Sequence, residues 1–375
     1  MGGIYIHIPY CRTKCLYCDF YSGGIRIAQW TSYVDCLINE MTSRIEELKE
    51  TPETLYMGGG TPSLIPLREL TRLMSKLKEI LNVSEWEEFT LEVNPEDVNE
   101  DNVKKWRNSG VNRISIGIQS LINKELKVIG RRHTSQDAER AIKLLKSEFD
   151  NFSVDIINGL PYQTTDSYLY TLNKIIDFDP SHISTYTLML EPGTALTRLS
   201  EEQRILLPRE EETLKMMKDT TELLEMAGYS RYEISNFSKP GFESIHNNNY
   251  WTGKPYIGLG PSAHSYDGEK TRRANPNDIK GYLKRFMTIP GNPFYSEEHL
   301  TEDESREEMI MLRLRTKIGL DPEEFEKRFG QDAKKDLFQK SHNFILHGYM
   351  KEEKNRLAFT NEGFMVSDFI LSSII

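Results

Sequence analysis

Short apolar runs recur along the first half of the chain, and longer amphipathic stretches separate them. Six runs have the length and the β-branched content of strands: residues 4–8, 54–57, 89–93, 113–118, 153–157 and 182–187. Apolar residues at spacings of three and four form helical stripes between them, as in Leu70, Leu73, Leu77 and Leu81. Similar stripes cover residues 34–48, 138–145 and 172–176. The repeated strand-then-helix order predicts an α/β fold whose parallel sheet is closed or partly closed into a (β/α)6 barrel.

The pattern changes after about Pro290, where charged residues become frequent. Residues 304–317, 322–329 and 333–347 have helical patterns, and a small strand-and-helix unit ends the chain. These elements predict a smaller, mainly helical domain of winged-helix type. We therefore expect a barrel over residues 1–235, a connecting segment over residues 236–290 and a C-terminal domain over residues 291–375.

Composition and charge narrow the classes of protein that fit. The 375 residues are 38% hydrophobic, which is enough for a substantial core, and the net charge of −10 argues against general binding of nucleic acid or anionic membranes. The N-terminus has no secretory signal, and no apolar run approaches the roughly 20 residues of a membrane span. Four cysteines do not make a disulfide framework. We therefore expect a cytoplasmic protein with reduced thiols.

Three of the four cysteines lie close together after the first predicted strand. Cys11, Cys15 and Cys18 have the spacing C-x3-C-x2-C. Three thiolates within eight residues can hold one soft metal centre, but they are too few to complete its coordination. A [4Fe–4S] cluster with three cysteine ligands keeps one iron open for another ligand.

Unusual polar or glycine residues also follow the other predicted strands. In a parallel barrel the loops after the strands converge on one site. Taken singly, the glycines are typical of a tight turn, and Glu92 and Arg131 of surface charges. Asp155 is different, because a carboxylate within an apolar strand needs a partner. Together these residues predict a pocket for a ligand with an ammonium, a carboxylate and a ribose, all of which S-adenosylmethionine (SAM) has; they are Gly58, Gly59, Gly60, Thr61, Glu92, Gln119, Arg131 and Asp155.

At this point the chain resembles the radical SAM proteins, and within them the oxygen-independent coproporphyrinogen-III-oxidase-like family of the HemW haem-chaperone type. The resemblance covers essentially the whole length and rests on YIHIPYCRTKCLYCDF, GGGTPSL, LEVNP, NRISIGIQS, IGRRH, DIINGLP and HNNNYW. It implies that Cys11, Cys15 and Cys18 hold the [4Fe–4S] cluster, whose electron can cleave SAM to a 5′-deoxyadenosyl radical. It also implies a SAM site lined by Tyr5, Tyr17, Gly59, Gly60, Thr61, Glu92, Gln119, Arg131 and Asp155.

The segment HNNNYW resembles the haem-binding motif of the chaperone branch. An imidazole is a common axial ligand of haem iron, and aromatic rings offer flat apolar faces to a porphyrin, so His246, Tyr250 and Trp251 are candidate haem residues. The residues alone favour a loop histidine, with the two aromatic residues plugging the open barrel, and the resemblance reverses this preference.

Two departures distinguish this chain from the true oxidases of the family. Cys18 is followed by Asp19 and Phe20 rather than by a further cysteine, and only three residues precede the first strand. We therefore expect a haem chaperone that uses the cluster and SAM and delivers haem to apo-haemoproteins, respiratory ones among them, through transient contact with membrane proteins. The alternatives are anaerobic oxidative decarboxylation of coproporphyrinogen III and a zinc-structured binding protein, so enzymatic activity stays open.

Overall fold

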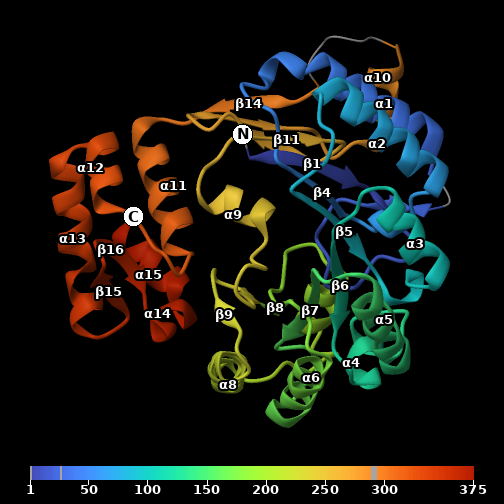
Figure 1. The fold of residues 1–375 in the computed structure, drawn as a ribbon. Coiled ribbons are helices and arrows are strands. Elements are labelled where there is room, and N and C mark those ends of the chain that lie inside the picture. Colours follow the sequence, from blue (N-terminus) through green and yellow to red (C-terminus); the bar gives the residue numbers. More distant parts are fainter. Residues whose placement is uncertain (1, 26–27, 289–293) are drawn as a thin grey trace.

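The computed structural model describes residues 2–25, 28–288 and 294–375, and one large sheet organises most of them (Figure 1). Twelve strands of the described residues form this sheet, in the order β14-β13-β12-β11-β1-β4-β5-β6-β7-β8-β10-β9. The six predicted strands lie at its centre and run parallel, which confirms the predicted α/β architecture. Their bounds are β1 Gly3–Ile8, β4 Thr54–Gly59, β5 Glu88–Val93, β6 Arg113–Gln119, β7 Phe152–Asn158 and β8 His182–Thr187.

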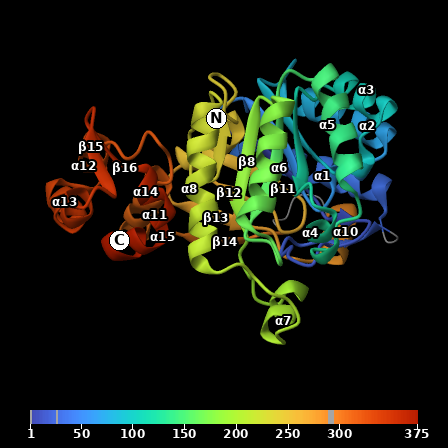
Figure 2. The ribbon, with the colours of Figure 1, turned by 90° about the horizontal axis from the view of Figure 1, so that it is seen from below.

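Helices cover the outer face of the curved sheet (Figure 2). The stripe predicted over residues 70–81 lies in α2, whose leucines Leu70, Leu73 and Leu77 are buried in the main core. Capping boxes built on Thr134 and Thr164 begin α5 and α6. The helices of this layer are α1 Trp30–Ser43, α2 Leu67–Leu81, α3 Glu100–Asn108, α4 Asn123–Val128, α5 Ser135–Glu148, α6 Thr165–Phe178, α8 Glu210–Met226 and α10 Ile279–Thr288. Helix α7, Ala195–Glu201, projects away from this layer (Figure 2), and its Leu196 N–H donates to the Leu16 carbonyl of the cysteine loop at 2.8 Å.

Further strands extend the sheet at both edges and leave it open. Beside β1, the parallel strand β11 is followed by three antiparallel strands, and beside β8 lie β10 and β9. Within the described residues the two outer strands, β14 and β9, do not pair with each other, so the barrel is partial. These strands are β9 Ser230–Arg231, β10 Asn236–Ser238, β11 Tyr256–Leu259, β12 His264–Tyr266, β13 Thr271–Ala274 and β14 Ser296–His299; β2 Tyr10–Cys11 and β3 Gly23–Gly24 form a separate small pair.

The C-terminal elements form a second core beside the barrel (Figure 1). Three helices precede a β-hairpin, as in a winged-helix domain, and two short helices follow it. The predicted boundary between residues 290 and 291 lies outside the described residues. The elements are α11 Glu302–Leu314, α12 Pro322–Phe329, α13 Gln331–Leu346, β15 Met350–Glu353, β16 Arg356–Phe359, α14 Asn361–Met365 and α15 Ser367–Ile374.

The two ends of the parallel strands are closed by different parts of the chain. The loop with the three cysteines follows β1 at the carboxyl ends of the strands. Helix α9, Ile245–Trp251, lies at the amino ends, where His246 contacts the first residues of β4 and β5, Thr54 and Glu88. The cysteines and the HNNNYW segment therefore lie at opposite ends of the barrel. Among the residues that the structure describes, no helix is both long and apolar enough to span a membrane.

Candidate functional site

A cavity of about 370 Å³ opens at the carboxyl ends of the strands, where the sequence predicts the site. The loops after β1, β4, β5, β6 and β8 contribute to its wall, and β7 contributes residues of the strand itself. The structure brings together eleven of the predicted residues on this wall, namely Cys11, Cys15, Tyr17, Cys18, Gly59, Gly60, Thr61, Glu92, Gln119, Arg131 and Asp155.

The three cysteines share one side of the cavity. Cys11 is buried and accepts a hydrogen bond from the Thr61 hydroxyl at 3.5 Å, and Cys15 accepts one from Arg131 Nη1, also at 3.5 Å. Burial raises the pKa of Cys18 to about 11, so this thiol keeps its proton at neutral pH until a metal displaces it. Cys36, by contrast, is fully buried in α1, away from the cavity, as a structural thiol.

The arrangement of these thiols suits a cluster better than a single ion. Among the described residues, no three histidine, cysteine or acidic side chains lie close enough to hold one metal ion. In a [4Fe–4S] cluster each cysteine binds a different iron, so the three sulfur atoms lie at separate corners of one cube rather than around one ion. The zinc alternative, which requires a closed set of ligands around one ion, gains no support from this arrangement.

The glycine loop after β4 lies against Glu92 of β5, and both line the cavity. Gly59 has a φ of +107°, and a Cβ there would lie 2.5 Å from the His7 ring, so no other residue fits. Its N–H donates to Glu92 Oε2 at 3.1 Å, and the Tyr56 hydroxyl donates to Glu92 Oε1 at 2.8 Å. Burial raises the pKa of Glu92 to about 7, and a cationic ligand would favour its ionised form.

Arg131 and Gln119 each have one buried polar atom that no described residue satisfies. The Arg131 guanidinium donates through Nη2 to the Gly117 carbonyl and to Asn94 Oδ1, whereas the neighbouring Arg132 is exposed, as expected. Gln119 has a positive φ of 68° where the register between β6 and β7 shifts. Arg131 Nε and Gln119 Oε1 are buried without a hydrogen-bond partner among the described residues. Such atoms need an external partner, and a polar ligand in the cavity would supply it.

Asp155 lies midway along β7 and is held by two serines. Ser115 Oγ donates to Oδ2 at 2.8 Å, and Ser153 Oγ donates to Oδ1 at 2.9 Å. Burial raises the pKa of this carboxyl group. Ser115, Asn94 and Tyr186 also line the cavity and were not among the predicted residues. The two-residue period of β6 could have indicated Ser115, and Asn94 stands within the quoted LEVNP.

Tyr5 and the HNNNYW residues lie outside this cavity. The Tyr5 ring stacks on Tyr56, with ring centres 6.1 Å apart, and its hydroxyl contacts His7 Nδ1 at 3.1 Å. His246 and Tyr250 belong to α9 at the other end of the barrel. The Tyr250 ring packs edge-on against His246 and Tyr256, with ring centres 5.0 and 4.6 Å apart, and His246 is helical rather than in a loop.

Both ring nitrogens of His246 are occupied. The Thr54 hydroxyl donates to the Gly2 carbonyl at 3.1 Å, so it accepts from His246 Nδ1–H at 2.8 Å. His246 Nε2 therefore accepts the hydroxyl proton of Tyr250, also at 2.8 Å. His246 is only 1% exposed, and burial lowers its pKa to about 3, so the ring is neutral. His246 Nε2 can bind haem iron only after the Tyr250 hydroxyl has turned away from it.

Comparison with known proteins agrees with this geometry. Residues 5–175 match the radical SAM superfamily, and residues 300–366 match the HemN C-terminal domain. The solved structure of coproporphyrinogen III oxidase (HemN) from Escherichia coli, described as a radical SAM enzyme, superposes with a TM-score of 0.83 at 21% identity, covering 99% of this chain and 89% of that one. The fold and the cysteine-lined cavity thus define a radical SAM protein.

Similar proteins show to which family of radical SAM proteins the chain belongs. The haem chaperone HemW of Lactococcus lactis is 34% identical over 99% of this chain and 96% of its own length. HemW of Bacillus subtilis is 32% identical over 100% of this chain and 99% of its own. The chain belongs to the HemW family of radical SAM proteins. This family implies a [4Fe–4S] cluster and SAM, and the cavity, with three thiols and unsatisfied polar atoms, fits both groups.

Proposed function

We propose that the protein is a haem chaperone, which binds haem and passes it to apo-haemoproteins. The observation that carries the proposal is the full-length similarity to HemW chaperones, together with the HNNNYW segment as helix α9 between the barrel and the C-terminal domain. Arg313 of α11 donates to the Trp251 carbonyl at 3.4 Å, so the second domain touches the proposed haem helix directly.

The cavity residues are proposed to serve the cluster and SAM. Cys11, Cys15 and Cys18 would hold the cluster, which supplies an electron for reductive cleavage of SAM when both are bound. Arg131 would pair with the carboxylate of SAM, for which its planar fork is suited. Glu92 and Asp155 would accept hydrogen bonds from its ammonium and ribose hydroxyls.

Haem titration of the purified protein tests the proposal. We expect saturable binding by the full chain and at least tenfold weaker binding by His246→Ala. Tyr250→Phe should bind haem about 3- to 10-fold more tightly, because it frees Nε2 from one hydrogen bond. The change in haem absorption on titration measures each affinity.

The matched control is His264→Ala, since His264 is exposed in β12 and should not affect binding. Melting curves of all variants separate lost binding from lost folding. Absence of saturable haem binding by the unchanged, folded chain would end the chaperone proposal.

The affinity for SAM should depend on pH through Glu92. Its pKa of about 7 means that the carboxyl group is protonated in the ligand-free protein below neutral pH, and a cationic ligand needs it ionised. SAM affinity is therefore expected to fall as the pH drops below 7, approaching about tenfold per pH unit. Calorimetry from pH 5.5 to 8.5 measures this profile.

Glu92→Gln should bind SAM weakly at every pH, and its SAM affinity should not fall further as the pH drops below 7. Glu87→Gln, on the exposed surface before the same strand, should keep the normal profile. An unchanged profile in Glu92→Gln would assign the pH dependence to another group.

The second candidate function is oxidative decarboxylation of coproporphyrinogen III. The rim of the cavity favours it, because the exposed Phe20, Tyr186 and Met189 offer apolar surface to a tetrapyrrole near the cysteines. An anaerobic assay with reconstituted cluster, SAM and a reductant decides, since formation of protoporphyrinogen IX would replace the chaperone proposal.

A further inference from the structure

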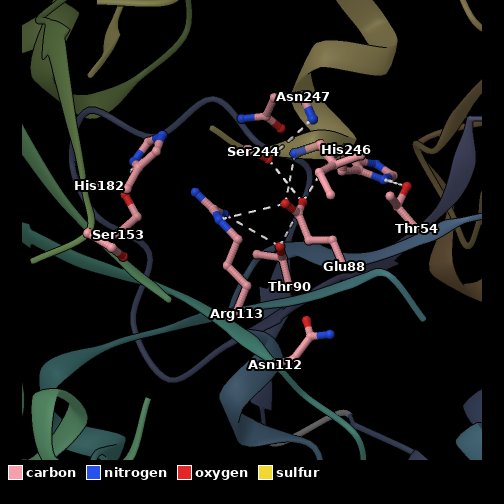
Figure 3. A network of polar contacts seen from close by, with 12 residues as sticks. Thr54, Glu88, Thr90, Asn112, Arg113, Ser153, His182, Ser244, His246 and Asn247 are labelled. Carbon is pink, nitrogen blue, oxygen red and sulfur yellow. Dashed lines mark hydrogen bonds and ion pairs between the residues drawn. The ribbon is translucent and has the colours of Figure 1, made fainter. Parts of the chain in front are cut away.

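A buried carboxylate from the barrel holds the first turn of α9 (Figure 3). Glu88, only 2% exposed at the start of β5, accepts hydrogen bonds from Ser244 Oγ at 3.0 Å, Ile245 N at 2.8 Å and His246 N at 3.1 Å. The equally buried Arg113 lies 3.9 Å from the same carboxylate. Helix α9 is thus fixed to the barrel at its N-terminal end, next to the candidate haem ligand.

A continuous chain of hydrogen bonds leads from this turn to the cavity at the other end of the barrel. The Ser244 N–H donates to the Tyr232 hydroxyl at 3.3 Å, and this hydroxyl lies 2.8 Å from His182 Nε2. His182 Nδ1 lies 2.8 Å from Ser153 Oγ, which donates to Asp155 Oδ1 at 2.9 Å. Figure 3 shows the His182–Ser153 pair beside Arg113 and the α9 turn.

The ionisation of Asp155 sets the direction of the three bonds between side chains in this chain, whereas the Ser244 N–H always donates. An ionised carboxylate can only accept, so Ser153 donates to it and accepts from His182 Nδ1–H. His182 Nε2 then accepts the Tyr232 proton, which leaves the Tyr232 oxygen free to accept from Ser244 N–H. A protonated Asp155 can donate to Ser153 and permits the other tautomer of His182, whose Nε2–H competes with Ser244 for the same oxygen.

Asp155 faces the cavity, where a bound cation would change this balance. Burial raises the pKa of Asp155, so the ligand-free protein resists its ionisation. A sulfonium or ammonium group in the cavity favours the ionised form. Binding of a cation in the cavity would therefore change the hydrogen bonds from Asp155 as far as Tyr232, which holds Ser244.

We propose that Ser153, His182 and Tyr232 are positioning residues that couple the SAM cavity to α9. SAM bound at Asp155 tightens the hold on Ser244, keeps His246 covered and so weakens haem binding, which favours haem release. This inference rests on the proposed haem-chaperone function. Linkage requires that haem weaken SAM binding by the same factor.

Tyr232→Phe gives the sharpest test, because it cuts the chain without touching the cavity. Haem is titrated into cluster-loaded protein under anaerobic conditions, with and without saturating SAM. In the unchanged protein SAM should raise the haem Kd about fivefold or more. In Tyr232→Phe the two haem Kd values should agree within about twofold, while the SAM affinity measured by calorimetry without haem stays near normal.

Ser153→Ala and Ser115→Ala form a matched pair. Each removes one hydrogen bond to Asp155, so both should weaken SAM binding, but only Ser153 continues to His182. We expect Ser115→Ala to keep the effect of SAM on haem and Ser153→Ala to lose it; Ser153→Thr, which retains the hydroxyl, should restore it. Melting temperatures and iron content confirm that each variant is folded and loaded.

The outcomes separate the two proposals. Absence of saturable haem binding by the unchanged protein would overturn the chaperone function and this inference with it. Haem binding that SAM does not weaken, or an equal effect of SAM in Tyr232→Phe, would overturn the coupling alone and leave the chaperone function standing.

Discussion

Replacement of Cys15 by alanine is expected to abolish the cluster. Anaerobic reconstitution with iron and sulfide should give the unchanged protein a brown colour with four irons per chain, and Cys15→Ala almost none. The reason is that the remaining two thiols, Cys11 and Cys18, cannot hold a [4Fe–4S] cluster on their wall of the cavity. Iron analysis and visible absorption measure the loss.

Cys36→Ala is the matched control, because this thiol is fully buried in α1 and does not line the cavity. It should reconstitute to the normal iron content. Full iron loading of Cys15→Ala would show that the ligand set differs from the three proposed cysteines. A colourless unchanged protein with one bound zinc would revive the zinc alternative.

Glu88→Ala is expected to cause the largest loss of stability, about 3–5 kcal/mol in the free energy of unfolding. The substitution leaves the buried Arg113 without its carboxylate and deprives Ser244, Ile245 and His246 of their shared acceptor. Denaturant unfolding followed by tryptophan fluorescence measures the change.

Glu87→Ala is the control, since its side chain is exposed and should change stability by less than about 0.5 kcal/mol. The double variant Glu88→Ala/Arg113→Met should recover part of the loss, because neither buried charge remains. If Glu88→Ala lowers the free energy of unfolding by less than about 1 kcal/mol, the Glu88 carboxylate does not compensate the buried charge of Arg113.

The central strands could be predicted because their two faces differ chemically. In β7, Val154 and Ile156 are fully buried on the face that the helices cover, and they alternate with Ser153 and Asp155 on the inner face. The helical stripes were equally clear, and the predicted helix over residues 322–329 coincides with α12. Strand β11 was not predicted, since Tyr256–Leu259 is short and its partner β1 lies about 250 residues earlier in the sequence.

The candidate site could be predicted in outline from residues that follow strands. The cysteines, Glu92 and Asp155 share one cavity because parallel strands end at the same edge of the sheet. The orientation of His246 could not be predicted, since it depends on Thr54 and Tyr250, which only the folded chain brings to its two nitrogens. Similarly, no local pattern indicates that Glu88 caps a helix about 155 residues away.

The pairing of β1 with both β4 and β11 has a consequence for synthesis on the ribosome. The side of β1 that pairs with Tyr256–Leu259 has no partner until that strand emerges, about 200 residues after β4. At roughly 5–20 residues per second this interval lasts about 10–40 s. During it the nascent chain exposes an unpaired strand edge directly before its three oxidisable thiols, so aggregation and oxidation can both act on this segment until translation has passed β11.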